Sequence, residues 1–420
     1  MSYRLDNERR RRSLMNQSRL ERGQAASDEN VTLIERYFAA FGAGDIEAAL
    51  ECIHPDAIWH VDGDPAVVTV GIIRGRDAVR CWLERFPTGF RPLSFSVDRL
   101  IAEDADVIAL GRFRHRVQPT DAIVDSDYAI RFTVRDGLIA RYQIFEDSLL
   151  IAAARHSAKP ARQALINGSL YGWDDSGSGR TIIFLHGLFL NRQFWTPLID
   201  RLGGNGRFVT FDMPGHGIST WREGLDLDGI ADDLVLWIME NGAAPATIVG
   251  HSQGGMIALR IAARYPDAVE RLVVVNSSAR PEYPDRIDAW RTRRLALLDA
   301  TARNEVLKDV QRMTTSPGWL EAHPVEAASE REAMASHDPA SLALALDAAV
   351  LDRGDMRPHL TGIKVPVAVI SGELDNATPF ELGQEIANSV GDGRHVIVKG
   401  AAHHVPTEQP EAIADLLRTG

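Results

Sequence analysis

Cysteine is scarce in this 420-residue chain, which contains only Cys52 and Cys81. Two cysteines cannot form a disulfide framework, and no cluster of cysteine and histidine has the spacing of zinc ligands. Long apolar runs are also lacking, and the arginine-rich start MSYRLDNERRRRSLMNQ is followed by none long enough for a signal peptide or a membrane span. We therefore expect a cytoplasmic protein with no bound metal and no cofactor.

Positive charge is in the minority as well. The chain has 46 lysine and arginine residues against 58 aspartate and glutamate residues, which gives a formal net charge of -12. Such a chain has no overall field that would attract nucleic acid or an anionic membrane, and acidic neighbours dilute the arginine run at residues 9–12. We expect a small-molecule partner. A chain of 420 residues is longer than the length at which a single hydrophobic core stops growing, so two domains are expected.

The first third of the chain predicts a tail followed by an α+β domain. Residues 1–30 carry few large apolar side chains and are expected to form a flexible tail. From residue 31 apolar residues recur at helical spacing, and Asp45 is a candidate cap for a second helix. Alternating strands then dominate up to residue 152, with a hairpin signal at Asp136-Gly137. This order favours a cone that encloses a cavity.

Three motifs in this domain carry a family resemblance: Tyr37-Phe38-Ala39-Ala40-Phe41, His54-Pro55-Asp56-Ala57-Ile58-Trp59 and Gly75-Arg76-Asp77-Ala78. On these motifs, residues 31–152 resemble the SnoaL-like or ketosteroid-isomerase-like proteins of the nuclear-transport-factor-2 superfamily. Isomerases of that family carry a carboxylate base just after the equivalent of strand AIWHV, where this chain has Val61 between His60 and Asp62. The resemblance implies a homodimer that pairs through the open sheet face. The candidate cavity residues are Tyr37, Trp59, His60, Asp62, Tyr128 and Glu146.

A linker is expected at residues 153–165, which are small, polar and contain a proline. From residue 166 to 420 the pattern changes to short apolar strands that alternate with longer helices. Runs that are apolar throughout indicate parallel strands buried on both faces, so this half is expected to be a doubly wound α/β sheet. The predicted strands are TIIFLHG, RFVTFDMPG, ATIVGHS, RLVVVNS, VPVAVISG and HVIVKGA.

The motif Gly250-His251-Ser252-Gln253-Gly254 lies between the strand ATIV and a helix, the context that G-x-S-x-G requires. Glycines are needed there because the turn brings the backbone too close to its neighbours for a β-carbon. A serine hydroxyl is a weak nucleophile at neutral pH, so it needs a histidine base and an acid that orients the histidine. Asp375 and His403 follow in that order, each after an apolar strand. Glu373 is a weaker alternative to Asp375.

The loop His186-Gly187-Leu188 is expected to turn the backbone N–H of Leu188 toward the serine, where it shares a developing oxyanion with the N–H of Gln253. With the serine motif, the turn Asp212-Met213-Pro214-Gly215-His216-Gly217, Asp375 and Gly400-Ala401-Ala402-His403, residues 166–420 closely resemble the α/β-hydrolase superfamily. The resemblance implies a serine hydrolase whose triad is Ser252, Asp375 and His403.

The resemblance also ranks the competing side chains. The spacing from His403 to Glu408-Gln409-Pro410 matches the family's histidine segment, which favours His403 over His404. Asn276 stands where some relatives carry their acid, but an amide cannot stabilise an imidazolium as a carboxylate does. Three further histidines lie beside glycines and are expected to shape turns: His186, His216 and His251.

A helical cap over the site is predicted at about residues 281–360, where polar-rich helical sequence interrupts the alternation of strands and helices. Caps supply much of a substrate pocket and exclude water. Asp338-Pro339-Ala340 and Asp355-Met356-Arg357-Pro358 resemble the 3-oxoadipate enol-lactonase branch, which implies a lactone or ester substrate. The candidates for substrate contact are Trp195, Trp290, Trp319, Arg291 and Arg294.

The leading hypothesis is hydrolysis of a carboxylic ester or lactone through an acyl-enzyme on Ser252, with His403 as the general base. The same triad would also serve cleavage of a carbon–carbon bond or a thioester. In a third alternative the N-terminal cone binds a polyketide-like or steroid-like ligand while the hydrolase half is silent. A bifunctional enzyme with a second site in the cone is the fourth.

Overall fold

The computed structural model of the protein describes residues 27–155, 157, 161–204 and 206–418. The chain divides into two compact units, Met1–Ala161 and Arg162–Gly420. Most of the predicted tail, residues 1–26, lies outside the described residues. Residues 27–30 correct that prediction, because they begin a helix that continues to residue 43. This helix is anchored by buried apolar side chains, and Asn30 donates to the Asp104 carbonyl at 2.9 Å.

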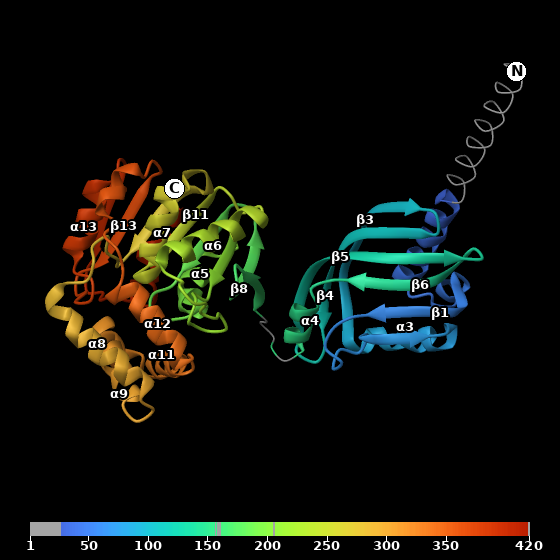
Figure 1. The fold of residues 1–420 in the computed structure, drawn as a ribbon, viewed down its shortest axis with the longest axis horizontal. Coiled ribbons are helices and arrows are strands. Elements are labelled where there is room, and N and C mark those ends of the chain that lie inside the picture. The colour runs from blue at the N-terminus through green and yellow to red at the C-terminus, as the bar shows by residue number, and fades with distance from the viewer. Residues whose placement is uncertain (1–26, 156, 158–160, 205, 419–420) are drawn as a thin grey trace, which may run out of the picture. The chain divides into compact units, whose positions relative to one another are not determined.

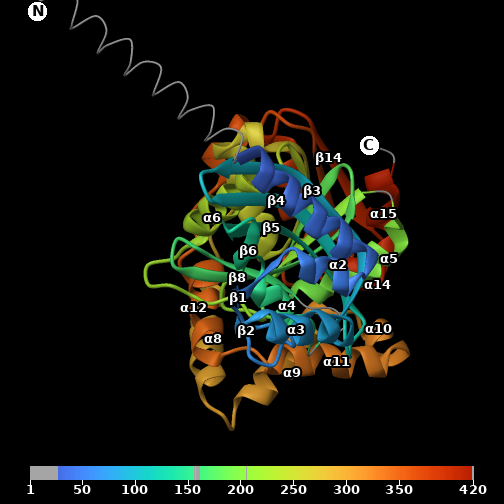
Figure 2. The ribbon, with the colours of Figure 1, turned by 90° about the vertical axis from the view of Figure 1, so that its right-hand side faces the viewer.

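The N-terminal unit is an α+β cone built around one curved sheet (Figure 1). The strand order is β2-β1-β6-β5-β4-β3, in which β1 and β6 are parallel and all other neighbours are antiparallel. In Figures 1 and 2, α3 lies beside β1 and β2. After the first helix, the elements are α2 (Ile46–Glu51), β1 (Ile53–Val61), β2 (Gly71–Arg74), α3 (Arg76–Gly89), β3 (Phe90–Glu103), β4 (Asp106–Val117), β5 (Ala122–Arg135), β6 (Leu138–Phe145) and α4 (Ser148–Ala154).

Alternation along β4 and β5 sends every second side chain into the cone. Phe113 and Ile130 are buried inside, whereas Arg112 and Arg131 are exposed outside. The predicted hairpin between β5 and β6 turns at Asp136 and Gly137, which have φ values of +54° and +71°. This α+β fold confirms the fold class expected for the unit.

Two elements of this unit are missing from the prediction. The strand β2 has only four residues and is held by pairing with β1, a long-range contact that alternation cannot reveal. The helix α4 begins after Asp147, whose side chain accepts from the Leu150 N–H at 3.0 Å. Because α4 ends at Ala154 and the next strand begins at Arg162, the linker is shorter than the predicted 153–165.

The C-terminal unit is a doubly wound α/β fold, as predicted. Its sheet has the order β14-β13-β12-β11-β9-β10-β8-β7, antiparallel at β10–β8 and β8–β7 and parallel elsewhere. The strands are β7 (Arg162–Ile166), β8 (Ser169–Ser178), β9 (Thr181–Leu185), β10 (Gly206–Phe211), β11 (Ala246–His251), β12 (Val269–Val275), β13 (Val367–Gly372) and β14 (Gly393–Val398).

Both faces of this sheet are covered, which explains the uniformly apolar strands. Ile183 and Leu185 pack with α6 (Leu227–Glu240) and α7 (Gln253–Arg264) in one core cluster. Ile182 and Phe184 pack in a second cluster, which includes Leu198 of α5. The helices that flank the sheet are completed by η1 (Arg192–Trp195), α5 (Thr196–Leu202), η2 (Pro266–Ala268), α13 (Phe380–Ser389), α14 (Val405–Glu408) and α15 (Pro410–Arg418).

The hairpin of β7 and β8 lies partly in the predicted linker and corrects it. Its turn is Asn167-Gly168, with φ values of +48° and +94°. This dipeptide is a strong sequence signal for a two-residue hairpin turn, so local information was sufficient here.

Helices follow β12 where the cap was expected. They are α8 (Pro284–Leu298), α9 (Arg303–Thr314), α10 (Pro317–Ala322), α11 (Pro324–Ala335), α12 (Pro339–Leu346), the π-turn η3 (Asp347–Leu351) and η4 (Arg357–Gly362). No helix in the described ranges is both long and apolar enough to cross a membrane. Within the same ranges, no three histidine, cysteine or acidic side chains are grouped so that they could hold a metal ion.

Candidate active site

Ser252 lies in a strained turn between β11 and α7. Its φ of +50° and ψ of -115° form a combination that non-glycine residues rarely adopt. Hydrogen bonds hold the turn on both sides. The Ser252 N–H donates to the Val275 carbonyl at 2.9 Å, and the Ser252 carbonyl accepts from the Ser277 hydroxyl at 2.7 Å. The hydroxyl therefore projects from a fixed backbone at the carboxyl end of the central strands.

Glycine is required on both sides of this serine for steric reasons. A β-carbon on Gly250 would lie 2.3 Å from the Gly254 carbonyl oxygen, and one on Gly254 would lie 2.0 Å from the Leu185 oxygen at the end of β9. A β-carbon on Gly187 would lie 2.9 Å from that of Ser252. These contacts place the loop after β9 directly against the serine.

His403 is oriented by a buried carboxylate. Its Nδ1 lies 2.8 Å from Oδ2 of Asp375, and both side chains are almost fully buried. The backbone of His403 is also fixed, because its N–H donates to the Thr314 carbonyl and its carbonyl accepts from His251 Nε2, each at 2.9 Å. Since Nδ1 faces Asp375, Nε2 is the nitrogen left for proton transfer.

Asp375 accepts four further hydrogen bonds, none of which was predicted from the sequence. Asn276 Nδ2 donates at 2.6 Å and the Thr378 hydroxyl at 2.7 Å, both to Oδ2, while the N–H groups of Ala377 and Thr378 donate to Oδ1. Burial disfavours the charge of Asp375, but His403 and these donors outweigh it, so the pKa of the carboxyl is lowered. Thr378, three residues after Asp375, stands at the position where a side-chain-stabilised turn places such a donor.

A cavity of about 60 Å³ joins the parts of this site. Ser252 and His403 line it, as do Leu188 and Gln253, the two residues expected to donate N–H groups to an oxyanion. The cap supplies most of the remaining wall, including Trp290 from α8. The cap side also contains a buried ion pair, Arg353 to Glu282 at 3.2 Å. The wall is otherwise mainly apolar, so the serine faces a small and largely apolar cavity.

His404 and Glu373 face different partners from His403 and Asp375. His404 Nδ1 lies 3.5 Å from Glu330 of α11 and 3.2 Å from the Thr315 hydroxyl. Burial lowers the pKa of His404, but Glu330 outweighs burial and raises it overall. Glu373 accepts from the Gly400 N–H at 2.9 Å. His404 thus ties the histidine loop to the cap, and Glu373 ties it to β13.

The three histidines beside glycines form hydrogen bonds with backbone groups. His186 Nε2 accepts from the Met213 N–H at 2.9 Å, and His216 Nε2 accepts from the Phe189 N–H at 3.0 Å. His251 contacts the His403 carbonyl, as described above. Burial lowers the pKa of all three, to about 4 for His186, so they are uncharged at neutral pH. These bonds shape the loops around Ser252.

Of the predicted substrate contacts, only Trp290 is in the wall of the serine cavity. Trp195 is fully buried beside Phe184 and Phe194, because the short helix η1 turns it into the core. Trp319 lines a separate outer cavity of about 1180 Å³ between η1, α5 and the cap.

The two predicted arginines also lie outside the serine cavity. Arg291 is exposed and donates to Asp288 on its own helix at 3.1 Å. Arg294 donates to Asp347 and so joins α8 to η3. Both predictions of substrate contact are corrected, because helical spacing alone did not show which face of α8 closes on the serine.

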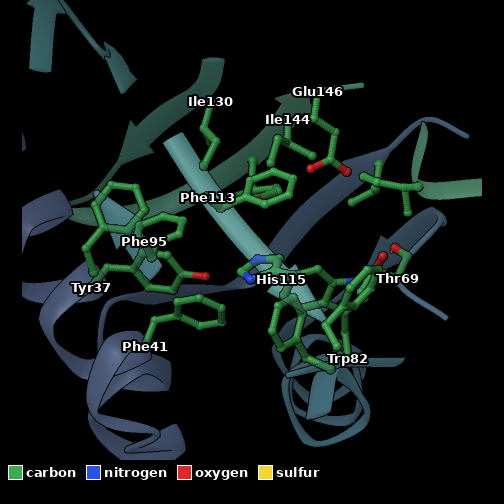
Figure 3. A pocket seen from close by; sticks show the side chains of 16 residues that line it. Tyr37, Phe41, Thr69, Trp82, Phe95, Phe113, His115, Ile130, Ile144 and Glu146 are labelled. Carbon is green, nitrogen blue, oxygen red and sulfur yellow. The ribbon is translucent and has the colours of Figure 1, made fainter. Parts of the chain in front are cut away.

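The N-terminal unit contains its own cavity of about 50 Å³ (Figure 3). Two of the six candidate cavity residues, Tyr37 and Glu146, line it, whereas the other four do not. Trp59 is buried in a stack on Tyr142, with ring centroids 5.0 Å apart. His60 and Asp62 pair with each other at 2.9 Å, and Tyr128 donates to the Ser96 carbonyl at 2.8 Å. His115 and Thr69 line the cavity but were missed, since only the alternation of β4 could have indicated that His115 points inward.

Comparison with known families separates the two units. Residues 182–416 match the family described as "Alpha/beta hydrolase family", and residues 34–142 match the "SnoaL-like domain". A pimeloyl-[acyl-carrier protein] methyl ester esterase from Neisseria meningitidis is 30% identical over 246 residues, which cover 57% of this chain and 92% of the relative.

Two solved structures are similar to the C-terminal unit. The enol-lactonase from Burkholderia xenovorans LB400 superposes with a TM-score of 0.57 and 26% identity, covering 61% of this chain and 98% of its own. A hydrolase from Pseudomonas aeruginosa PA01 has a TM-score of 0.57 and 25% identity, covering 62% and 97%.

Gly254→Ala is expected to damage the serine turn, because the new β-carbon would overlap the Leu185 oxygen. Overpacking of this kind costs about 1–3 kcal/mol of unfolding free energy, and a displaced serine lowers turnover by about 10²-fold. Gly318→Ala is the matched control, since a β-carbon there meets nothing within 4 Å. Denaturant unfolding and hydrolysis of an activated ester measure both effects. Equal behaviour of the two variants would contradict the steric argument.

Proposed function

Because the chain belongs to the alpha/beta hydrolase family and carries a SnoaL-like domain before its hydrolase domain, we propose that it hydrolyses a carboxylic ester or lactone through an acyl-enzyme on Ser252. One observation carries the proposal. Ser252 and His403 line the same cavity, and His403 is held by a 2.8 Å contact to the buried Asp375. A nucleophile, a base and an orienting acid are thereby available in one small chamber.

In the first half of the reaction, the Ser252 hydroxyl attacks the substrate carbonyl carbon while His403 Nε2 takes its proton. The carbonyl oxygen becomes an oxyanion, for which the N–H groups of Leu188 and Gln253 are the assigned donors. Collapse of this intermediate breaks the bond to the alkoxy oxygen, which leaves with the proton from His403. The products of this half are an alcohol and an ester of Ser252; with a lactone, both remain one molecule.

In the second half, His403 takes a proton from water, and the resulting hydroxide attacks the acyl-enzyme. The Ser252 oxygen leaves and regains its proton from His403, which releases a carboxylic acid. Throughout, Asp375 stays ionised and stabilises the imidazolium. The four further donors to Asp375 support this role, because hydrogen bonds to both of its oxygens stabilise the charged carboxylate.

The ester or lactone class rests on the relatives named above, an esterase and an enol-lactonase. The chamber supports it, because the predominantly apolar cap wall suits the acyl part of a small uncharged substrate and excludes water. On the low cysteine content, the cytoplasm is the proposed place of action.

We further propose that two copies pair through the outer face of the N-terminal sheet. Ile101 of β3 is 42% exposed on that face, beside Ile108 of β4, which in turn neighbours Arg131 of β5. Apolar side chains on an open sheet face are stabilised when a second copy covers them. The contact would be symmetric, with the same patch on both subunits.

A fluorophosphonate probe is expected to label Ser252, since the probe reacts with a serine activated by a neighbouring base. In Ser252→Ala both labelling and ester turnover should be lost, with residual turnover lower by about 10⁶-fold. Mass spectrometry of the labelled peptide identifies the site. Labelling of another serine together with full activity in Ser252→Ala would refute the assignment.

His403→Ala should be nearly inactive, whereas His404→Ala should keep substantial activity, because only His403 contacts Asp375. Asp375→Asn should lose about 10³–10⁴-fold in kcat, since an amide favours the wrong imidazole tautomer. Steady-state kinetics on one activated ester compare the three variants. The reverse order for the two histidines would make His404 the base.

The intact protein is expected to be a dimer by light scattering. Ile101→Lys should shift it toward the monomer, because a charge replaces apolar contact surface at the proposed interface. Ile72→Lys is the control, since Ile72 is 62% exposed on β2 at the other edge of the sheet. A monomeric intact protein, or equal dissociation by both variants, would overturn the proposed interface.

A further inference from the structure

Gln253 carries a side-chain amide that lies in the wall of the serine cavity and has no partner among the described residues. Its Nε2 and its Oε1 are both buried, and neither makes a hydrogen bond within the described ranges. The residue as a whole is only 1% exposed, so solvent does not replace the missing partners. The amide therefore has two donor hydrogens and an acceptor oxygen that the folded chain leaves unused.

Most of the other polar side chains in the wall of this cavity have partners in the protein. Glu282 pairs with Arg353 at 3.2 Å. Thr314 donates to the Val310 carbonyl at 2.9 Å. The missing partner of the amide is therefore not a general property of the wall. Further members of the wall with partners described above are Thr378, His403 and His404.

An unpaired amide is unfavourable at a buried position. A buried donor or acceptor without a partner costs the full free energy of its desolvation, and such groups are rare in native proteins. Methionine is a similar unbranched side chain that demands no hydrogen bond, so it would fill the same space without that cost. A glutamine is explained here if a molecule that enters the cavity completes the hydrogen bonds of its amide.

The chemistry of the amide selects a hydroxyl group. Nε2 only donates and Oε1 only accepts, so a single partner that satisfies both atoms must accept and donate. A hydroxyl does both, whereas a keto or ether oxygen only accepts. A charged group would satisfy one atom and would bring an unpaired charge into a mainly apolar wall, in which Arg353 and Glu282 already neutralise each other.

The amide belongs to a residue that also binds the carbonyl oxygen in the proposed reaction. Gln253 follows Ser252 directly as the first residue of α7, and its backbone N–H is an assigned oxyanion donor. The alkoxy group faces His403, because His403 gives it a proton as it leaves. A side chain on the oxyanion-binding residue is thus best placed to reach the first carbons of the acyl chain.

We propose that the Gln253 side chain determines specificity by binding a hydroxyl on the acyl chain, at the carbon next to the carbonyl or one carbon further. The substrates are then esters or lactones of 2- or 3-hydroxy acids. The apolar part of the wall, which includes Leu188, Met256 and Trp290, contacts the rest of the acyl chain. Because it describes the acyl group of the Ser252 acyl-enzyme, this assignment rests on the proposed hydrolase function.

Substrates that differ only by a hydroxyl or a methyl group test this specificity with the full-length protein. Each enantiomer of 4-nitrophenyl 2-hydroxypropanoate is compared with the 2-methylpropanoate, and each enantiomer of the 3-hydroxybutanoate with the 3-methylbutanoate. The lactone pair is 2-hydroxy- and 2-methyl-γ-butyrolactone. In at least one pair the hydroxyl compound should be preferred by about tenfold in kcat/KM, after each value is divided by the compound's rate of alkaline hydrolysis.

Equal corrected values within every pair would overturn the role of Gln253 and leave the hydrolase function standing. A preference for the methyl compounds would do the same, because it would show an apolar contact where the amide is expected to bind. Turnover of none of these esters and lactones would instead refute the proposed hydrolase function, and the assignment of Gln253 with it.

Gln253→Met identifies the group that is responsible. The substitution keeps the backbone N–H but removes the amide, so the preference for the hydroxyl compound should fall about tenfold. The ratio within a pair is the quantity measured, since any change in the oxyanion donor alters both members alike. Gln193→Met is the control and should keep the wild-type ratio, because Gln193 lines the outer cavity. An unchanged ratio in Gln253→Met, or an equal fall in both variants, would overturn the assignment.

Unfolding in denaturant separates substrate recognition from a structural role of the amide. If the amide serves the substrate, its replacement in Gln253→Met should leave the denaturant midpoint unchanged or raise it, because an unpaired buried group is removed. A clear fall in the midpoint would show that the amide stabilises the folded chain and would overturn the proposal.

Discussion

The close approach of backbones at the carboxyl end of β11 is the contact on which the candidate active site depends. Gly250 and Gly254 allow the turn at Ser252 to pack against the end of β9, with less room than a β-carbon needs. The same contact brings the loop at Gly187 against the serine, so the proposed nucleophile and its expected oxyanion donors lie together. The strained backbone conformation of Ser252 persists because the packed strands on both sides hold the turn in place.

Around this turn, hydrogen bonds keep the negative charge on Asp375. Asp375 keeps its charge in the interior because five donors surround it, counting His403, Asn276, Thr378 and the two backbone N–H groups. His186, His216 and His251 are neutral and connect the loops around Ser252 through hydrogen bonds to the backbone. The cap then closes the site through apolar side chains and the pair of His404 with Glu330. Ion pairs and hydrogen bonds thus position the candidate catalytic groups, while mainly apolar side chains line the rest of the cavity.

The two cavities of the chain use burial in opposite ways. In the hydrolase domain, a buried carboxylate is fully paired and its pKa is lowered. In the N-terminal domain, Glu146 has no side-chain hydrogen bond or ion pair among the described residues, and burial raises its pKa to about 7. The first arrangement suits a group that must stay charged during a reaction, whereas the second leaves a carboxyl that is only partly ionised at neutral pH. Burial alone therefore does not predict the charge of a carboxyl group; its hydrogen-bond donors decide it.

The sequence by itself determined the fold class of both units and the order of serine, aspartate and histidine after apolar strands. These features are local: alternation, uniform apolarity and a glycine-flanked serine depend on neighbours along the chain. The hairpin at Asn167-Gly168 was not predicted, although this dipeptide is itself a local signal for a two-residue turn. Only the tertiary structure decided that Asn276 reaches Asp375, that Trp290 but not Trp195 lines the serine cavity, and that His115 and Glu146 share a cavity. Those facts depend on which faces of distant elements meet, and packing between elements, not spacing within one, sets that choice.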